Sequence, residues 1–317
     1  MPSISIVMAS YNSDAWIENT LRSILAQSYR DFELIIIEDG SSDQTSAIIK
    51  QFSDSRIQLI EQPNTGLTKA LMRGCALARG KYIARHDAGD FSFENRLADQ
   101  MRVLEENHQT VLVSCSTKFV TPLNEQVYII DHSKNSTSNT LEQRSTHQLI
   151  GPPHHGSVMF RTADYKKVGG YRAQFKVAQD IDLWSRLLEF GNHISLATVA
   201  YQAILEPDSI SMCKRDQQLQ MQKFIIECIK ERKAKGNDDR VLNDIENYYD
   251  KELNKPRTHH DSKAAYNYFL GSNLLKTKPS ASLKYLRESL RHNYLQPKAY
   301  LKLIYAGFLT MLRSRRY

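Results

Sequence analysis

The first hundred residues alternate between short apolar runs and longer amphipathic stretches. Residues 4–8 and 32–37 are apolar on both faces and too short for helices, as is typical of buried parallel strands. Between them, residues 17–25 place apolar side chains at i, i+4, i+7 and i+8, which is one face of a helix, and Ser13 is available as its N-cap. The pattern predicts a strand, a helix and a second strand parallel to the first.

The alternation continues beyond this unit. It predicts a helix after Ser42, a strand at 57–60, a helix at 67–78 and a strand at 82–84. The expected product is an α/β fold with an open, mostly parallel sheet and helices on both of its faces. Ligands of such sheets bind at the carboxyl ends of the strands.

The later part of the chain gives a mixed and then a helical pattern. Strands are predicted at 111–115, 127–130 and 156–160, and a helix at 181–190. Residues 131–148 are rich in Ser, Thr, Asn and His and predict a mobile loop. After residue 211 every segment is helical, and those at 264–275, 280–291 and 298–312 are spaced like a single tetratricopeptide-type repeat.

Charge is distributed unevenly along the chain. The 317 residues carry a formal net charge of +7, but residues 1–210 have a net charge of −4 and residues 251–317 one of +11. A nucleic-acid-binding body would surround its site with Lys and Arg interleaved with aromatic residues, so no nucleic-acid partner is expected. The basic tail indicates either a surface that meets something anionic, such as the inner leaflet of a membrane, or a solvated helical face.

The cysteines indicate no metal or redox site, and the hydropathy indicates no membrane-spanning or signal segment. The four cysteines, Cys75, Cys115, Cys213 and Cys228, contain no C-x-x-C pair and are expected to be reduced and mostly buried. No run approaches the ~20 apolar residues of a membrane-spanning helix, and the N-terminus has no basic segment leading into an apolar one. The expected location is therefore the cytoplasm.

Polar residues follow the predicted strands of the first hundred residues. Ser10 and Tyr11 come after the first strand, Asp39 after the second, and Asp87 and Asp90 after the fourth. Neither the G-x-G-x-x-G motif of dinucleotide sites nor the phosphate-binding G-x-x-x-x-G-K-[ST] loop is present. A sheet that presents carboxylates in place of a glycine-rich cradle needs a metal ion to neutralise the phosphate charge of a ligand.

A series of motifs runs through the first two thirds of the chain. Its early members are IVMASYN at 6–12, EDGSSD at 38–43, NTGL at 64–67, ARGKYIARHDAGD at 78–90 and NRL at 95–97. Its later members are HGSVMFR at 155–161, VGGYR at 168–172 and AQDIDLWSRL at 178–187. Each motif alone is weak, but the ordered series resembles the inverting family 2 glycosyltransferases of the GT-A fold, of the type that builds bacterial polysaccharide or lipopolysaccharide.

The resemblance implies a division of the chain. Residues 1–211 resemble a GT-A (Rossmann-like) glycosyltransferase domain, with a nucleotide-binding half at 1–105 and an acceptor half at 106–211. Residues 212–317 have no such match and form an all-helical C-terminal region. The pocket of such a domain holds a nucleotide-diphosphate sugar, commonly one of uridine or thymidine.

The resemblance also implies nucleotide-binding roles for Ser10, Tyr11, Asp39 and Asp87. Tyr11 would pack on the pyrimidine, Asp39 would accept a hydrogen bond from the base imide, and Asp87 would bind the ribose. The alternative for Asp39 is the N-cap of the helix that begins after Ser42.

The chain departs from the family at the metal-binding motif. Family members commonly read Asp-x-Asp-Asp, whereas this chain reads Asp87-Ala88-Gly89-Asp90, so that Gly89 replaces the usual metal ligand. Asp90 and Asp87 are the candidate ligands of a Mn²⁺ or Mg²⁺ ion, directly or through water. The alternative for Asp90 is a cap of the helix that contains Arg96.

Asp180 occupies the position of the general base of the family. An inverting transfer is a single in-line displacement, which needs one base to take the proton of the acceptor hydroxyl. Gln179 stands where the family usually has Glu, and it is a candidate contact of acceptor or phosphate. His154 and His155 are further candidates for such contacts, or a structural pair.

Two neighbours of Asp180 have structural interpretations. Asp182 is expected to pair with Arg186 at i+4 on the same helix. Trp184, which has apolar residues at helical spacing around it, is expected to lie in the core.

The leading hypothesis is an inverting, hexosyltransferase-like enzyme. It would move a sugar from a nucleotide-diphosphate sugar, expected to be UDP-linked, to a hydroxyl of a glycan or lipid-linked acceptor at the cytoplasmic face of a membrane. The alternatives are a nucleotide-sugar-binding protein without turnover, favoured by Gly89 and Gln179, and a scaffold whose helical tail recruits partners. Retention of Asp87 and Asp180 argues against the former, and the ordered carboxylates at the strand ends argue against the latter.

The basic tail at 298–317 is amphipathic. Its apolar residues include Ala299, Leu303, Ile304 and Phe308, which favours peripheral contact with an anionic membrane. The alternative is that the same face packs on the preceding helix pair. The sequence is also compatible with an oligomer.

Overall fold

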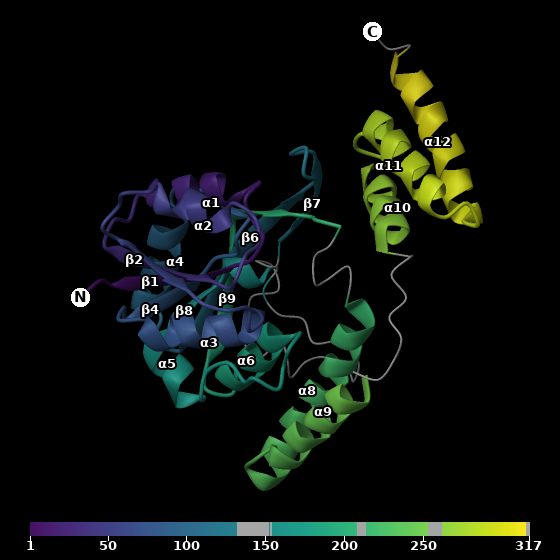
Figure 1. Cartoon of the computed structure of the whole chain (residues 1–317). Helices are drawn as coiled ribbons and strands as arrows, with labels where there is room; N and C mark the ends of the chain where they lie inside the picture. Colours follow the sequence, from purple (N-terminus) through teal and green to yellow (C-terminus); the bar gives the residue numbers. More distant parts are fainter. Residues whose placement is uncertain (132–151, 153, 208–213, 253–261, 315–317) are drawn as a thin grey trace. The chain divides into compact units, whose positions relative to one another are not determined.

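The computed structural model describes residues 1–131, 152, 154–207, 214–252 and 262–314. The chain forms two compact units (Figure 1). The sheet unit comprises Met1–Lys118, Ile129–Ala203 and Asp216–Asp250, and the helical unit comprises Phe119–Tyr128, Ile204–Arg215 and Lys251–Tyr317. Cys213 and the loop predicted at 131–148, apart from its first residue, lie outside the described residues.

Four parallel strands form one half of the sheet. In spatial order they are β3 (Ile57–Glu61), β2 (Phe32–Glu38), β1 (Ile4–Ser10) and β4 (Tyr82–Arg85). β1 lies between β2 and β4 and pairs in parallel with both. Every residue of β2 and β4 is buried, because helices cover both faces of the sheet (Figure 1). The predicted parallel alternation of strands and helices is confirmed.

Alternate residues of the strands supply two separate cores. One core joins Ile6 and Met8 of β1 to α1 (Ile17–Leu25), α2 (Thr45–Lys50) and α4 (Arg96–Glu106). The other core joins Val7 of β1 and Ile35 of β2 to α3 (Leu67–Leu77). A Cβ at Gly74 of α3 would lie 2.6 Å from Cγ1 of Val7, so glycine is what allows α3 to lie this close to the sheet.

The start of α1 differs from the prediction. Its N-cap is Trp16, and no side chain caps it. Ser13 instead accepts, through its backbone carbonyl, the N–H groups of Trp16 and Ile17 at 3.0 and 2.9 Å. The first helical N–H groups are thus satisfied by a preceding backbone turn, which makes the predicted side-chain cap unnecessary.

The other half of the sheet is antiparallel. β8 (Met159–Arg161) pairs antiparallel with β4 and with β6 (Thr110–Val120). The sheet then continues through β9 (Asn192–Ile204) to β5 (Phe91–Ser92), and β7 (Gln126–Ile130) pairs with β6. The strand predicted at 156–160 was wrong in its first half, because residues His155–Ser157 form a 3₁₀ turn. β9 was not predicted from the sequence, because its apolar and polar residues do not alternate regularly.

Four further helices among the described residues belong to the sheet unit, and they are α5 (Thr162–Lys167), α6 (Gln179–Leu187), α8 (Arg215–Lys235) and α9 (Asp239–Glu252). Buried ion pairs connect α6 to α8 and to the residue before α9. Asp182 of α6 is fully buried and pairs with Arg172 and, as predicted, with Arg186 at 2.6 Å. Arg172 also pairs with Asp238 at 2.9 Å, and Asp238 pairs with Arg232 of α8 at 2.6 Å. Trp184 lies in the core, which confirms its structural interpretation.

The helical unit is built around a pair of helices, α10 (Ser262–Leu274) and α11 (Pro279–His292). They approach closely at Gly271, where a Cβ would lie 2.7 Å from Cγ of Leu286. A third helix, α12 (Pro297–Ser314), packs against α11. By packing, α8 and α9 belong to the sheet unit, whereas the sequence assigns them to the C-terminal region; the domain boundary at residue 211 stays a prediction.

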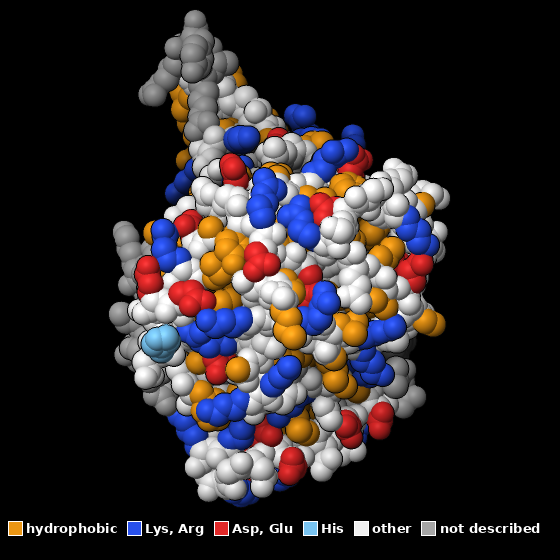
Figure 2. All heavy atoms as spheres, turned by 90° about the vertical axis from the view of Figure 1, so that its left-hand side faces the viewer, with side chains coloured by type: hydrophobic (Ala, Val, Ile, Leu, Met, Phe, Trp, Pro, Cys, Tyr) orange, Lys and Arg blue, Asp and Glu red, His pale blue; other side chains and the backbone are white. Residues whose placement is uncertain are grey.

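The surface carries charges of both signs. Figure 2 shows one face of the molecule, on which Lys and Arg side chains are interspersed with Asp, Glu and apolar side chains. Such a mixed face produces no broad potential of one sign. Among the described helices, none has the length and apolarity that crossing a membrane requires.

Candidate active site at the carboxyl ends of the strands

The loops that follow β1 and β2 are joined by hydrogen bonds. The N–H of Asp39 donates to the Ser10 carbonyl at 2.9 Å. Asn12 has a left-handed backbone with φ 48°, donates its N–H to Oγ of Ser41 at 2.9 Å and accepts the N–H of Ser42 at 2.9 Å. Tyr11, between these anchors, is 52% exposed. An exposed aromatic ring on a fixed turn is suited to stacking on a planar ligand.

Asp39 is held by the start of α3, and the structure gives it no role at α2. Its Oδ1 accepts Nε2 of Gln62 at 2.6 Å and the N–H of Thr65 at 2.9 Å, and its Oδ2 accepts the N–H of Gly66 at 2.8 Å. The turn before α2 is instead bonded by Asp43, which accepts the N–H of Thr45 at 3.0 Å. Oδ2 of Asp39, which accepts the N–H of Gly66, keeps a second lone pair for a further donor.

Gln62, Thr65 and Gly66 hold the Asp39 carboxylate, and sequence reasoning left them without a role. The signal was present, because Gln62 follows the third strand and the other two belong to the NTGL motif. What the pattern could not show is that the loop after β3 folds over the end of β2.

Asp87 follows β4 and lies against a buried guanidinium. Arg85 is fully buried, donates to the carbonyl groups of Val7 and His86 at 2.7 Å each, and forms an ion pair with Asp87. Burial alone would raise the pKa of Asp87, but the Arg85 guanidinium and the neighbouring histidines hold it below its ordinary value. Asp87 is therefore an anion at any physiological pH.

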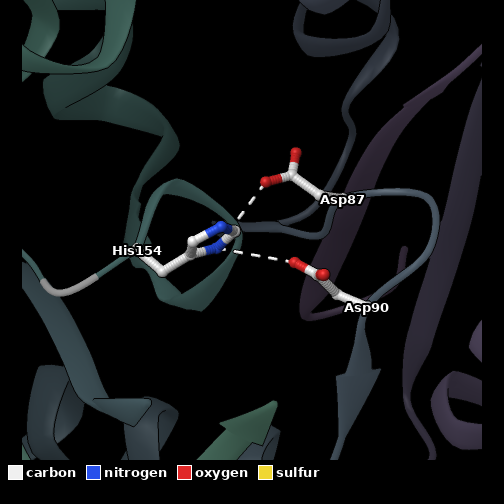
Figure 3. Close-up of side chains that lie close together, drawn as sticks. All are labelled: Asp87, Asp90 and His154. Atoms are coloured by element: carbon white, nitrogen blue, oxygen red, sulfur yellow. Dashed lines mark ion pairs between the residues drawn. The ribbon is translucent and has the colours of Figure 1, made fainter. Parts of the chain in front are cut away.

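Asp87, Asp90 and His154 converge on one point (Figure 3). Nδ1 of His154 lies 3.7 Å from Oδ2 of Asp87 and 3.5 Å from Oδ2 of Asp90. One ligand atom from each of the three residues lies within 4.8 Å of the others. The two distances from Nδ1 of His154 are longer than hydrogen bonds, and both fall within the ~4.4 Å that can separate two ligand atoms held at ~2.0–2.2 Å from one cation. Burial lowers the pKa of His154, so at neutral pH its imidazole is uncharged. Its Nδ1 accepts the N–H of Gly156 at 3.1 Å, so a cation bound to Nδ1 would replace that hydrogen bond.

Gly89, which replaces the usual metal ligand of the family, lies in a turn that favours glycine. Gly89 has φ 111°, which strains any other residue, and its N–H donates to Oγ1 of Thr20 at 3.1 Å. The same hydroxyl donates to the carbonyl of Asp90 at 2.7 Å, which fixes the turn to α1. The alternative role of Asp90 as a helix cap is not seen, since Asn95 is the N-cap of α4.

Tyr201 of β9 contacts both His154 and Asp87, and sequence reasoning missed it. Its ring stacks on His154 with centroids 5.5 Å apart, and its hydroxyl accepts the N–H of Asp87 at 3.1 Å. The guanidinium of Arg96 lies over the same ring at 4.8 Å. A Cβ at Gly156 would lie 2.0 Å from the Tyr201 hydroxyl. Glycine in the HGS motif was the one sequence signal of this close contact.

His155 points away from its neighbour His154 and into the interior. Its Nε2 is 2.7 Å from the Tyr171 hydroxyl and 3.4 Å from Nε of Arg85. Burial holds its pKa well below the ordinary value. Its described contacts are thus with buried protein groups, and its role as a direct acceptor or phosphate contact stays a prediction.

Asp180 lies in the first turn of α6. The N-cap, Ala178, has a left-handed backbone with φ 57°, and Gln179 is buried. Burial raises the pKa of Asp180 to about 6, the Ile181 N–H opposes this shift, and the negative charge of Asp87 adds to it. A carboxylate with a pKa near 6 is ionised at neutral pH and is a stronger base than an ordinary Asp.

Known proteins are similar to this chain in sequence over about two thirds of its length. A family model described as Glycosyl transferase family 2 matches residues 5–169. The chain is 32% identical over 199 residues to EpsE of Bacillus subtilis, described as a glycosyltransferase, which covers 60% of this chain and 68% of that protein. It is 24% identical over 220 residues to chondroitin synthase of Pasteurella multocida, 69% of this chain and 22% of that protein.

Solved structures of S. aureus TarS share the fold. The structure of its residues 1–349 with UDP has a TM-score of 0.58 and 18% identity, covering 99% of this chain and 92% of that one. The complex of TarS with UDP-GlcNAc gives a TM-score of 0.59 and the same identity. The predicted fold class, a GT-A-like mixed sheet flanked by helices and followed by C-terminal helices, is confirmed. Since the family model also matches more than half of the chain, the protein belongs to glycosyl transferase family 2, an inverting family, and transfers a sugar from a nucleotide sugar.

Proposed function

We propose that the protein transfers a sugar from a UDP-sugar to a hydroxyl of a glycan or lipid-linked acceptor, with inversion at the anomeric carbon, in the assembly of a bacterial surface polysaccharide. The observation that carries the proposal is the convergence of Asp87, Asp90 and His154 near Asp180, whose pKa is raised to about 6. It combines a place for a diphosphate with a base of suitable strength. The enzyme would act at the cytoplasmic face of the membrane.

Tyr11 and Asp39 would hold the nucleotide. The exposed ring of Tyr11 offers a stacking surface, and Oδ2 of Asp39 can accept the imide N–H of uracil. Because three loop groups already fix the Asp39 carboxylate, little ordering is required when the base binds. Ser10 would contribute through the same turn, and Asp87 through the ribose.

Asp87, Asp90 and His154 would hold a divalent cation, which would neutralise the charge of the departing diphosphate. The donor set of two carboxylates and one imidazole suits Mn²⁺ better than Mg²⁺, which prefers oxygen ligands throughout. Arg85 keeps Asp87 ionised, and Tyr201 fixes the ring of His154. In this arrangement His154, the residue before the HGS motif, would supply the ligand that Gly89 lacks.

Asp180 would take the proton of the acceptor hydroxyl. As that oxygen bonds to the anomeric carbon, the bond from this carbon to the diphosphate oxygen breaks, and its electron pair leaves with UDP. The proton remains on Asp180 until solvent removes it. Gln179 would contact the acceptor or the phosphate beside Asp180.

A donor screen tests the proposal. UDP-GlcNAc, the donor bound by TarS, and other UDP- and dTDP-sugars would be added to the protein with Mn²⁺, and both the melting temperature and UDP release would be measured. We expect a UDP-sugar to raise the melting temperature and to release UDP when an acceptor glycan is present. Stabilisation without release for every donor and acceptor would favour a nucleotide-sugar-binding protein without turnover.

A further inference from the structure

The last helix, α12, exposes a broad apolar face. Its exposed large residues follow one another at helical spacing, so that they lie on one side of the helix. We call this side the outer face of α12; it consists of Tyr300, Leu301, Ile304, Tyr305, Phe308 and Leu312, which are exposed by 45% to 72%.

α12 packs on its neighbours with its opposite, small-residue side. Ala299 and Ala306 are fully buried, and the amine of Lys302 donates to Oγ of Ser272 of α10 at 2.7 Å. The same amine lies 4.5 Å from the centre of the Tyr268 ring. The helix is therefore fixed without using the large apolar residues of the outer face. An ordinary surface helix buries that side and exposes its polar one, so the outer face is built to be covered by something else.

The charge of this region identifies what covers it. Glu288 is the last acidic residue of the chain, and residues 289–317 contain six Lys or Arg and no Asp or Glu. Two copies of the helix placed face to face would bring these like charges together, which opposes self-association. An anionic lipid surface accepts both features, because apolar side chains enter the acyl boundary while basic ones bind the phosphates.

The tyrosines and the turn before the helix favour the same partner. Tyr300 and Tyr305 have an apolar ring and a polar hydroxyl, a combination suited to the boundary between headgroups and acyl chains. Tyr294 and Leu295, in the turn before α12, are 71% and 74% exposed. With its large apolar residues on one side, α12 is suited to lying in the plane of the interface.

We propose that the outer face of α12 lies on an anionic membrane surface, parallel to the membrane plane, and holds the protein there as a peripheral protein. The larger apolar residues enter the lipid, and Lys298, exposed at the start of the helix, contacts lipid phosphates. This surface serves any acceptor that is lipid-linked, and it does not depend on the identity of the sugar.

Co-sedimentation of the full chain with vesicles tests the proposal. The wild type is compared with the triple variant Leu301→Gln, Ile304→Gln, Phe308→Gln on vesicles of phosphatidylcholine alone and with added phosphatidylglycerol. A matched control, Leu123→Gln with Leu219→Gln, removes exposed apolar residues at 61% and 48% exposure elsewhere. We expect binding to the anionic vesicles only, weakened by salt, lost at least about tenfold in the triple variant and unchanged within about twofold in the control.

Three results would overturn it: no binding by the wild type, equal binding by the triple variant, or a wild-type dimer that the triple variant turns into a monomer without any change in vesicle binding. Light scattering of both proteins supplies the last measurement. Release of UDP with a soluble acceptor, measured on the same samples, separates a failure of this surface from a failure of the proposed sugar transfer.

Discussion

The pKa of Asp180 leads to a quantitative prediction for the pH dependence of transfer. A base with a pKa of about 6 is roughly nine-tenths ionised at about pH 7 and one-tenth ionised at about pH 5. Since only the ionised carboxylate accepts the proton, kcat should fall about tenfold between these two pH values. An ordinary Asp, with a pKa of 3.8, would lose almost nothing over the same range.

Asp180→Asn removes the base and should lower kcat by ~10²–10⁴ while UDP binding survives. The residual rate should be independent of pH between about 5 and 7, because no group at position 180 titrates. The assay is steady-state UDP release with saturating donor, together with calorimetric titration of UDP at each pH. The titration shows whether protonation of His154 contributes to the loss by weakening binding.

Asp180→Asn should increase the stability of the fold although it lowers activity. Burial disfavours the ionised Asp180, so the folded state is destabilised above about pH 6, and this cost disappears as the pH falls below the ordinary pKa of 3.8. The shift from 3.8 to about 6 corresponds to a cost on the order of 3 kcal/mol at neutral pH. Asp180→Asn should therefore raise the free energy of unfolding at pH 7 and do so less at pH 4.

The matched control is Asp244→Asn, an exposed carboxylate of α9 whose replacement should change neither activity nor the pH profile. A flat wild-type profile between pH 5 and 7, or an Asp180→Asn variant that works within a few-fold of wild type, would refute the assignment of the base.

Three further predictions concern the residues around the site. Asp182→Ala leaves buried Arg186 without its carboxylate partner and Arg172 with Asp238 alone, so it should cost ~3–5 kcal/mol in urea unfolding. Asp244→Ala, from an exposed pair, should cost under ~1 kcal/mol, and similar costs for the two variants would contradict the account of the ion pairs. Asp39→Asn keeps the shape but loses the charge, and should weaken UDP binding about tenfold or more in a calorimetric titration; an unchanged affinity would remove Asp39 from base recognition. Gly156→Ala places a Cβ 2.0 Å from the Tyr201 hydroxyl, so it should lower the free energy of unfolding by ~1–3 kcal/mol and weaken Mn²⁺ binding. Adding Tyr201→Phe removes the hydroxyl and should restore part of both losses. Full Mn²⁺ affinity in the Gly156→Ala variant would contradict the support of His154 by Tyr201.

The parallel half of the sheet was predictable because its signals are local. The strand at 32–37 is apolar on both faces, and its neighbours alternate with helical spacing, so element type and order follow from the sequence alone. The short antiparallel elements were less accessible. β8 has only three residues and follows a 3₁₀ turn, so a run of apolar residues overstated its length.

The candidate site was predictable as a set of residue types at strand ends, and less so as a geometry. The group of Asp87 and Asp90 follows from the motif, but the approach of His154 depends on the loop before β8 crossing to the end of β4. Tyr201 could not be found, since it belongs to a strand far along the chain whose pairing is set by tertiary contacts. Long-range pairing of this kind leaves no periodic trace in a single sequence.

The ion pairs of Asp182, Arg172 and Asp238 have a consequence for modularity. They connect the helix that carries Asp180 to the start of α9, a part of the chain far beyond the residues matched by the family model. A transplant of the acceptor half into a relative would therefore need to include α8 and α9, and exchange of α6 alone would leave charged partners behind on the host. Natural recombination at residue 211 faces the same obstacle, so the stretch from 172 to 250 is expected to be inherited as one block.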